Sequence, residues 1–438
     1  METDKTTLTD LVIFDREDEF SVFNKINGTL TGRGKEQLRK LLARPLPDVA
    51  AIKAVQEIIR LIIQKKAEWP LIISNGTVMM LERFYDSNID PIPPRPSSVA
   101  AFSYKLLHGH DFSLVKYSVR HIFDFIKGMQ QAVRSFLEPG TPAPLKILLE
   151  EAEKILSRAE LKIISARDRA SDLQPAEMLE LAHFILYKYK LNISALLSIF
   201  GKMDAWYGMA VTTEKFGLTM PEFHDTDQPR IEVKGLYHLL LNDPVSYDVA
   251  LTENRNFLFL TGANMAGKST FIKSCGAAVY LAHTGMGVPA KEMSLSYFDG
   301  LLSNINVIDN IAKGESYFFN EVQRIKATLL KISDGRKWLI LIDELFKGTN
   351  VQDAMKCSSA VIEGLVKIKN AAFILSTHLY EIGDELKKYP NISFSYFETS
   401  VTDDQLSFSY RLKEGISNDR LGYLILKNEG VVKMLDEL

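Results

Sequence analysis

The sequence is poor in the features of secreted, membrane-spanning and strongly basic proteins. Its 438 residues include only two cysteines, Cys275 and Cys357, which give no disulfide framework and are typical of a reducing compartment. No uncharged apolar run reaches the ~18 residues that a membrane helix needs, and the N-terminus, METDKTTLTD, lacks the charged and then apolar build of a signal peptide. These absences predict a soluble, cytoplasmic protein without a membrane partner.

A strong positive charge is absent as well. The formal net charge is −3 at pH 7, so any contact with nucleic acid must come from a local patch rather than from the whole chain. One candidate patch consists of Arg33, Lys35, Arg39, Lys40 and Arg44. A solvated helix face explains the same pattern and is the favoured interpretation.

Residues 1–230 have the pattern of an all-α domain. Apolar side chains recur at i, i+3, i+4 spacing over residues 50–66, 144–164 and 177–210, which predicts a helix in each segment. Helices of this length are typical of arms that extend beyond a compact core. A plain helical bundle is an alternative with the same pattern.

Residues 231–438 alternate instead between short apolar runs and helical stretches. The runs over 257–262, 338–344 and 371–378 each end in a polar or Gly element, as strands buried on both faces of a parallel sheet do. A helix with one apolar face is predicted over 317–332. The alternation predicts an α/β domain with phosphate chemistry at the carboxyl ends of its strands.

The run FLFLTGANMAGKST contains a phosphate-loop motif, G-x-x-x-x-G-K-[ST], at Gly262, Gly267, Lys268 and Ser269. The glycines let the backbone turn and approach phosphate oxygens closely. Lys268 supplies a charge for the β- and γ-phosphates, and Ser269 a hydroxyl for Mg²⁺. A strand precedes the loop and a helix follows it, which is the context that the motif requires. ATP and Mg²⁺ are therefore the expected cofactors.

Three further polar positions fit hydrolysis of a nucleotide. Asp343 and Glu344 end an apolar strand, where Asp343 would hold Mg²⁺ and Glu344 would polarise the attacking water, although a pair that caps the next helix is an alternative. His378 ends the next strand and is predicted to sense the γ-phosphate. Ser316 opens an amphipathic helix, where it either caps that helix or presents a phosphate-binding helix end, and the two roles are compatible.

With these motifs in order, residues 231–438 resemble the ATPase domain of the MutS mismatch-repair family, a branch of the ABC-type ATPases. The family's loop typically reads TGPNMGGKST, and TGANMAGKST keeps Asn264 and Met265. Ala263 and Ala266 replace the usual Pro and Gly and remove no phosphate ligand. LIDELFKGTN, STHLYEI and GESYFFNEV resemble the family's magnesium strand, switch histidine and signature loop. The resemblance implies an α/β ABC-type P-loop ATPase domain preceded by an all-α core or lever-like domain.

The resemblance also implies a role for each site residue. Glu344 and His378 would be catalytic in their own subunit, and Ser316 would act in trans across a homodimer formed through the ATPase domain. Ser269 and Asp343 would bind Mg²⁺, and Tyr410 would stack on adenine. The remaining nucleotide contacts would come from Gly262, Asn264, Met265, Ala266, Gly267, Lys268, Ser269 and Thr270.

Residues 13–52 and 196–223 are similar to the start and the end of the family's core domain. Because residue 1 already falls at the beginning of that domain, we expect the mismatch-reading domain to be missing. Residues 103–195 leave little chain for long levers and a full DNA clamp. The family's second adenine-stacking aromatic falls near Pro244 and Val245, which predicts a weaker hold on the base from that side.

Three functions remain open at this point. The first is an ATP-driven dimeric clamp on branched or duplex DNA, acting in mismatch repair or recombination through backbone and shape contacts. The second is an ATP-gated protein or ribonucleoprotein interaction module without mismatch specificity. The third, the ATPase subunit of a transporter, is disfavoured by Asn264 and Met265.

Overall fold

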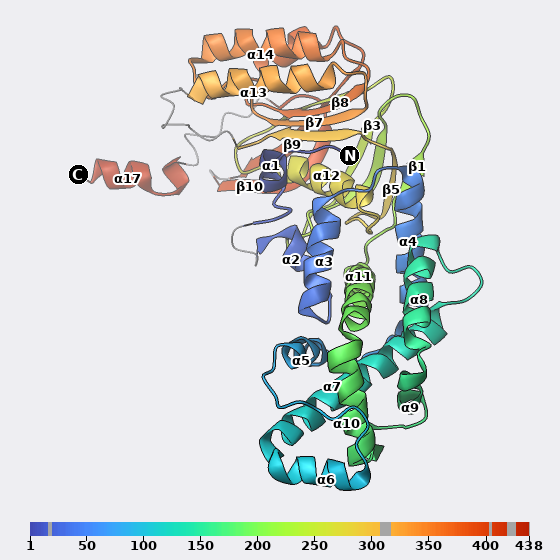
Figure 1. The fold of residues 1–438 in the computed structure, drawn as a ribbon. Coiled ribbons are helices and arrows are strands. Elements are labelled where there is room, and N and C mark those ends of the chain that lie inside the picture. The colour runs from blue at the N-terminus through green and yellow to red at the C-terminus, as the bar shows by residue number, and fades with distance from the viewer. Residues whose placement is uncertain (16–19, 307–316, 403–404, 418–425, 438) are drawn as a thin grey trace. The chain divides into compact units, whose positions relative to one another are not determined.

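The computed structural model describes residues 1–15, 20–306, 317–402, 405–417 and 426–437, and the chain divides into two compact units (Figure 1). The sheet unit comprises Met1–Lys25, Pro45–Ile52 and Phe216–Leu438, and the helical unit comprises Ile26–Arg44 and Lys53–Lys215. The predicted domain boundary at residue 230 stays a prediction.

The helical unit is built almost entirely from α-helices with buried apolar faces. They are α3 (Gly32–Ala43), α5 (Asn75–Tyr85), α6 (Ser98–Leu107), α7 (Gly109–Phe136), α8 (Ala143–Leu156), α9 (Lys162–Ser165), α10 (Pro175–His183) and α11 (Lys190–Lys215). Helix α4 (Val49–Gln64) begins in the sheet unit and continues into this one. Buried Asp204 of α11 accepts hydrogen bonds from the amides of Leu30 and Thr31, which fixes the start of α3 against α11.

Two of the three helices predicted here are shorter than expected. The helix expected over 144–164 ends at Leu156, and the one expected over 177–210 breaks at Tyr189, where φ is −123°. Tyr189 is buried, stacks on Phe184 with ring centroids 4.7 Å apart and donates a hydrogen bond to the carbonyl oxygen of Ile155. Tertiary contacts of one aromatic residue therefore override a continuous helical pattern.

The sheet unit contains a six-stranded sheet in the order β10-β9-β4-β8-β7-β6. All neighbours are parallel except β10 and β9. Strands β4, β6, β7 and β8 are buried on both faces, which explains their continuous apolar sequences. The strand bounds are β4 Phe257–Thr261, β6 Gly300–Asn304, β7 Trp338–Asp343, β8 Ala371–Ser376, β9 Ile392–Thr402 and β10 Gln405–Glu414.

A second sheet in the same unit has four strands in the order β1-β5-β2-β3. Its strands are β1 (Glu222–His224), β2 (Ile231–Leu236), β3 (Tyr247–Leu251) and β5 (Glu292–Ser296). The inward-facing ring of Tyr247 meets Phe271 and Phe397 at 5.4 and 5.6 Å between centroids. These rings join the second sheet to the first.

Helices cover both faces of the six-stranded sheet, with α13 and α14 on one face and α12 on the other (Figure 1). On the α13 face, Phe257 and Phe259 of β4 pack in a core with Ile325 and Ile362. The predicted strands and the helix predicted over 317–332 are confirmed. The helices of this unit are α1 (Lys5–Asp10), α2 (Val22–Lys25), α12 (Lys268–His283), α13 (Tyr317–Ile332), α14 (Val351–Leu365), α15 (Glu381–Leu386) and α17 (Val431–Asp436).

The first residues of the chain are fastened to the edge strand β6. Glu2 pairs with Gly300 at the start of that strand. At its far end, the carboxylate of Asp10 accepts hydrogen bonds from the Ser303 hydroxyl at 2.5 Å and from the Ile305 amide at 3.1 Å. None of the described helices combines the length and the apolar character that crossing a bilayer requires.

Candidate nucleotide site

The phosphate loop joins the buried strand β4 to helix α12 and has the backbone conformation that its glycines allow. Gly262 and Gly267 have φ values of 139° and 110°, in the left-handed region that L side chains rarely adopt. Gly267 is also the N-cap of α12, and no side chain within the described residues caps that helix end. The first amides of α12 are therefore available to an anion.

Lys268 lies inside the loop and is only 5% exposed. Its ammonium donates to the carbonyl oxygens of Gly262 at 2.8 Å and Ala263 at 2.9 Å, and lies 3.4 Å from Nε2 of His378. Burial lowers the pKa of Lys268 to about 8, against the raising effect of the carboxylates of Glu344 and Asp343. A bound phosphate could take the place of these two carbonyl oxygens as the hydrogen-bond partner of the Lys268 ammonium, which already lies within the loop.

Ser269 and Asp343, the predicted Mg²⁺ ligands, are brought together by the fold. The Ser269 hydroxyl donates to Oδ2 of Asp343 at 2.5 Å, and the Ser376 hydroxyl donates to Oδ1 of the same carboxylate. Asp343 is buried and lies opposite Ser376 in the parallel register of β7 and β8. A carboxylate beside a hydroxyl is a set of hard oxygen ligands, which fits Mg²⁺.

Glu344 follows Asp343 directly, and each of its two carboxylate oxygens has a nitrogen partner. Its Oε1 lies 2.6 Å from Nε2 of His378, and its Oε2 lies 3.2 Å from Nζ of Lys347. Burial raises the pKa of Glu344, but the hydrogen bond with His378 and the charges of His378 and Lys347 outweigh burial and lower the pKa to about 2. The side chain is therefore a carboxylate at neutral pH and can accept a proton or a hydrogen bond.

The residues expected to contact the rest of the nucleotide surround the same loop. Tyr410 is 42% exposed, and its ring lies beside Gly267, where an added Cβ would be 3.5 Å from Cδ1 of Tyr410. Asn264 and Met265 are exposed, Ala266 is buried and Thr270 is partly buried. Ser316, predicted to act in trans, lies outside the described residues.

On the opposite side of the expected adenine position, the family's second aromatic is replaced near Pro244 and Val245. Val245 is 37% exposed, and the next aromatic along the chain, Tyr247, is buried against Phe271 and Phe397. Val245 and Tyr247 line a cavity of about 1340 Å³ between the two sheets, together with Arg411. Tyr247 is therefore not free to stack on a base.

Two residues of this site have no motif of their own in the sequence, and our prediction missed them. Ser376 contacts Asp343 because β7 and β8 pair in one register, which a single sequence does not reveal. Lys347 follows Glu344 by three residues, and this spacing was the only feature of the sequence that could have indicated their ion pair.

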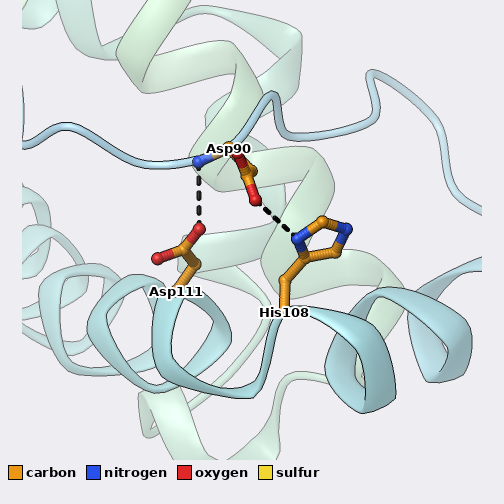
Figure 2. A group of neighbouring side chains, drawn as sticks. All are labelled: Asp90, His108 and Asp111. Carbon is orange, nitrogen blue, oxygen red and sulfur yellow. Dashed lines mark hydrogen bonds and ion pairs between the residues drawn. The ribbon is translucent and has the colours of Figure 1, made fainter.

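A second group of side chains, in the helical unit, was not predicted either (Figure 2). Asp90, His108 and Asp111 have ligand-type atoms within 4.8 Å of one another, the one such group of three found in the described parts of the chain. Nδ1 of His108 lies 2.7 Å from Oδ2 of Asp90, and the Asp90 amide donates to Asp111 at 3.0 Å. These contacts fasten the segment before α6 to the start of α7, and that structural role accounts for the group.

Comparison with known proteins agrees with this geometry. The family model for MutS domain V matches residues 258–435. The chain is 28% identical over 283 residues to the DNA mismatch repair protein MutS of Thermotoga maritima, a match that covers 63% of the chain and 34% of that protein. It is 29% identical over 289 residues to the MutS of Shouchella clausii and 29% identical over 279 residues to that of Aquifex pyrophilus. These matches cover 64% and 63% of the chain, and 32% of each relative.

Proposed function

The chain belongs to the MutS family, and on this premise we propose that it binds ATP with Mg²⁺ and hydrolyses ATP to ADP and phosphate. The observation that carries the proposal is the convergence of Lys268, Asp343, Glu344 and His378 at the carboxyl ends of three neighbouring strands. Phosphoryl transfer to water needs four kinds of group: backbone amides and a cation for the phosphates, oxygen ligands for Mg²⁺ and a carboxylate that accepts a proton from water. The site offers one of each in the loop amides, Lys268, the Ser269–Asp343 pair and Glu344.

Nucleotide binding rests on the loop and the first turn of α12. The free amides at Gly267 and beyond would hold phosphate oxygens, and Lys268 would exchange its two carbonyl partners for the β- and γ-phosphates. Tyr410 offers an exposed ring face beside Gly267 for adenine. Ser269 and Asp343 would hold Mg²⁺, which neutralises charge on the phosphates when bound.

Hydrolysis rests on Glu344. Its carboxylate stays ionised and can accept a proton from an attacking water, and His378 bridges the space between Glu344 and Lys268. The two carboxylate oxygens of Glu344 contact Nε2 of His378 and Nζ of Lys347, respectively. An attacking water would therefore join or displace one of these partners. Because His378 also lies 3.4 Å from Lys268, we assign it the role of orienting the base relative to the γ-phosphate.

DNA and a second copy of the chain are the proposed partners, since relatives that match the chain are named for DNA mismatch repair. A dimer formed through the sheet unit would let Ser316 reach the nucleotide of the other subunit, as the ABC-type resemblance implies. ATP binding would close such a clamp on branched or duplex DNA, and hydrolysis would open it. Mismatch repair and recombination-type transactions are the cellular roles that we propose.

One observation favours the second candidate, an ATP-gated protein or ribonucleoprotein interaction module. In the candidate DNA patch, Arg33 pairs with Glu82 at 2.5 Å and Lys40 pairs with Glu36 at 2.6 Å, so part of the positive charge is already neutralised. Affinity capture with and without nuclease separates the two candidates. Partners that survive nuclease treatment support the interaction module, and partners lost with the nucleic acid support the DNA clamp.

The ATPase assignment is tested by phosphate release from the purified full chain. Lys268→Ala should abolish nucleotide binding, whereas Glu344→Gln should bind ATP, fail to hydrolyse it and accumulate the closed dimer. Mixing Lys268→Ala chains with Ser316→Ala chains tests action in trans. An unchanged rate in Glu344→Gln would show that Glu344 is not the catalytic carboxylate.

A further inference from the structure

The loop that carries Glu344 is held in an unfavourable backbone conformation. Glu344 and Phe346 have φ values of 64° and 60°, and neither residue is glycine. Side chains in the left-handed region clash with their own backbone, so such residues persist only where the surroundings hold them. Two of them within three residues, directly after strand β7, require a specific restraint.

The buried carboxylate of Glu321, on helix α13, supplies that restraint. Glu321 is 5% exposed and accepts hydrogen bonds from the backbone amides of Lys347 at 3.3 Å and Gly348 at 3.4 Å. Burial raises the pKa of Glu321 above its ordinary value, against the lowering effect of the backbone amides that face its carboxyl group. A carboxyl group that accepts backbone N–H bonds fixes the amides that donate them, so Glu321 holds two successive amides of the strained loop.

The side chain of Phe346 reinforces the same arrangement. It is 4% exposed, and its ring meets Phe318, one turn before Glu321 on α13, at 5.6 Å between centroids. The loop is therefore tied to one helix through its backbone at Glu321 and through a side chain at Phe318. Both ties lie within four residues of Glu344 along the loop.

Helix α13 is itself fixed in place near Glu321. Arg324, one turn further along, donates to the Asn304 side chain at 2.5 Å and to the Ser303 carbonyl oxygen at 2.6 Å, at the end of β6. It also pairs with Asp4 at 3.3 Å. These contacts of Arg324 attach helix α13, which carries Glu321, to β6 and to the N-terminal segment.

We propose that Glu321 is a positioning residue for hydrolysis: by holding the amides of Lys347 and Gly348 it keeps the strained loop in the conformation that directs Glu344 toward His378. The inference rests on the proposed ATPase function. Glu321 touches none of the nucleotide-binding residues of the loop 262–270 in the contacts described above. Its loss should therefore lower the rate of hydrolysis and leave ATP binding intact.

The test compares Glu321→Ala and Glu321→Gln with the wild-type chain, with Glu363→Gln as the matched control. Glu363 is a partly exposed glutamate of α14 whose carboxylate pairs with Lys388 at 2.8 Å. A displacement of about 1 Å at a reacting group can cost about a hundredfold in rate, so we expect kcat of Glu321→Ala to fall about that far with the ATP dissociation constant within about twofold. Glu321→Gln keeps one acceptor oxygen, so its kcat should lie between those of Glu321→Ala and the wild-type chain.

A double variant separates positioning from general damage to the fold. Because Glu321 acts through Glu344, adding Glu321→Ala to Glu344→Gln should not lower the residual hydrolysis further. Additive losses in the double variant, equal losses of ATP binding and kcat, or an unchanged kcat in Glu321→Ala would each overturn the inference. If Glu321→Ala does not fold, Glu321→Gln decides it on the same criteria. A wild-type chain without Lys268-dependent hydrolysis would instead contradict the proposed function.

Discussion

Nε2 of His378 lies 2.6 Å from Oε1 of Glu344, and the same ring nitrogen lies 3.4 Å from the ammonium of Lys268. One imidazole therefore links the candidate base to the candidate phosphate ligand. The three residues follow different strands, which end at the same edge because β4, β8 and β7 are neighbouring parallel strands. We expect this contact to transmit the presence of a γ-phosphate to Glu344, the candidate base.

Replacing His378 by alanine should slow hydrolysis about a hundredfold, since a positioned acid–base partner typically contributes at least that much. ATP binding should change little, because the loop amides and Lys268 remain. Steady-state phosphate release and a nucleotide-binding titration measure the two effects. His224→Ala, on an exposed position of β1, is the control. A variant of His378 with wild-type kcat would contradict the proposed link.

ATP binding should weaken as the pH rises above about 8. Burial lowers the pKa of Lys268 to about 8 in the free protein, so the ammonium is charged below that pH and progressively neutral above it. Bound phosphates favour the charged form, and affinity should therefore be constant below pH 8 and then fall by up to about tenfold per pH unit. Titration of a fluorescent ATP analogue from pH 7 to about pH 9.5 measures this dependence. An affinity independent of pH over that range would contradict it.

Asp343→Asn should make nucleotide binding insensitive to Mg²⁺. The wild-type carboxylate lies 2.5 Å from the Ser269 hydroxyl, and a neutral amide is a poor ligand for a hard dication. Removal of Mg²⁺ with a chelator should therefore weaken ATP binding to the wild type and have little effect on Asp343→Asn. Ser376→Ala, which removes the other hydroxyl on Asp343, should retain the Mg²⁺ response.

Gly267→Ala should destabilise the protein and weaken nucleotide binding. With φ at 110°, any side chain at this position costs about 1–2 kcal/mol, and the new Cβ would lie 3.5 Å from the ring of Tyr410. Chemical unfolding without nucleotide measures the first effect. Gly364→Ala on α14 is the matched control, since nothing lies within 4 Å of its added Cβ, and there we expect a gain of about 0.5–1 kcal/mol.

Binding to four-way or duplex DNA should fall with salt if the protein contacts phosphates. Each neutralised phosphate releases condensed counterions, so two contacts would cost about tenfold in affinity between roughly 50 and 200 mM salt. Electrophoretic or fluorescence titrations with and without ATP measure the slope. Arg39→Gln tests the candidate patch of α3. Equal affinity at both salt concentrations would favour the protein-interaction module instead.

Much of the sheet unit could be predicted because its signals are local. Strands such as Phe257–Thr261 are apolar at every position since both of their faces are covered, and the turn at Gly262 and Gly267 needs conformations that only glycine adopts easily. The helix breaks at Leu156 and Tyr189 could not be predicted, since they depend on side-chain contacts between residues far apart in the sequence.

The sequence by itself determined the phosphate loop, the acidic strand end, the alternation of strands and helices, and the resemblance to the MutS family. These follow from residue chemistry and short-range periodicity. Only the tertiary structure decided that Ser376 binds Asp343, that Lys347 and His378 hold Glu344, that Glu321 anchors the loop after it, and that residues 1–25 belong to the sheet unit. Each of these depends on strand register or on packing between distant segments, which a local pattern of residues does not encode.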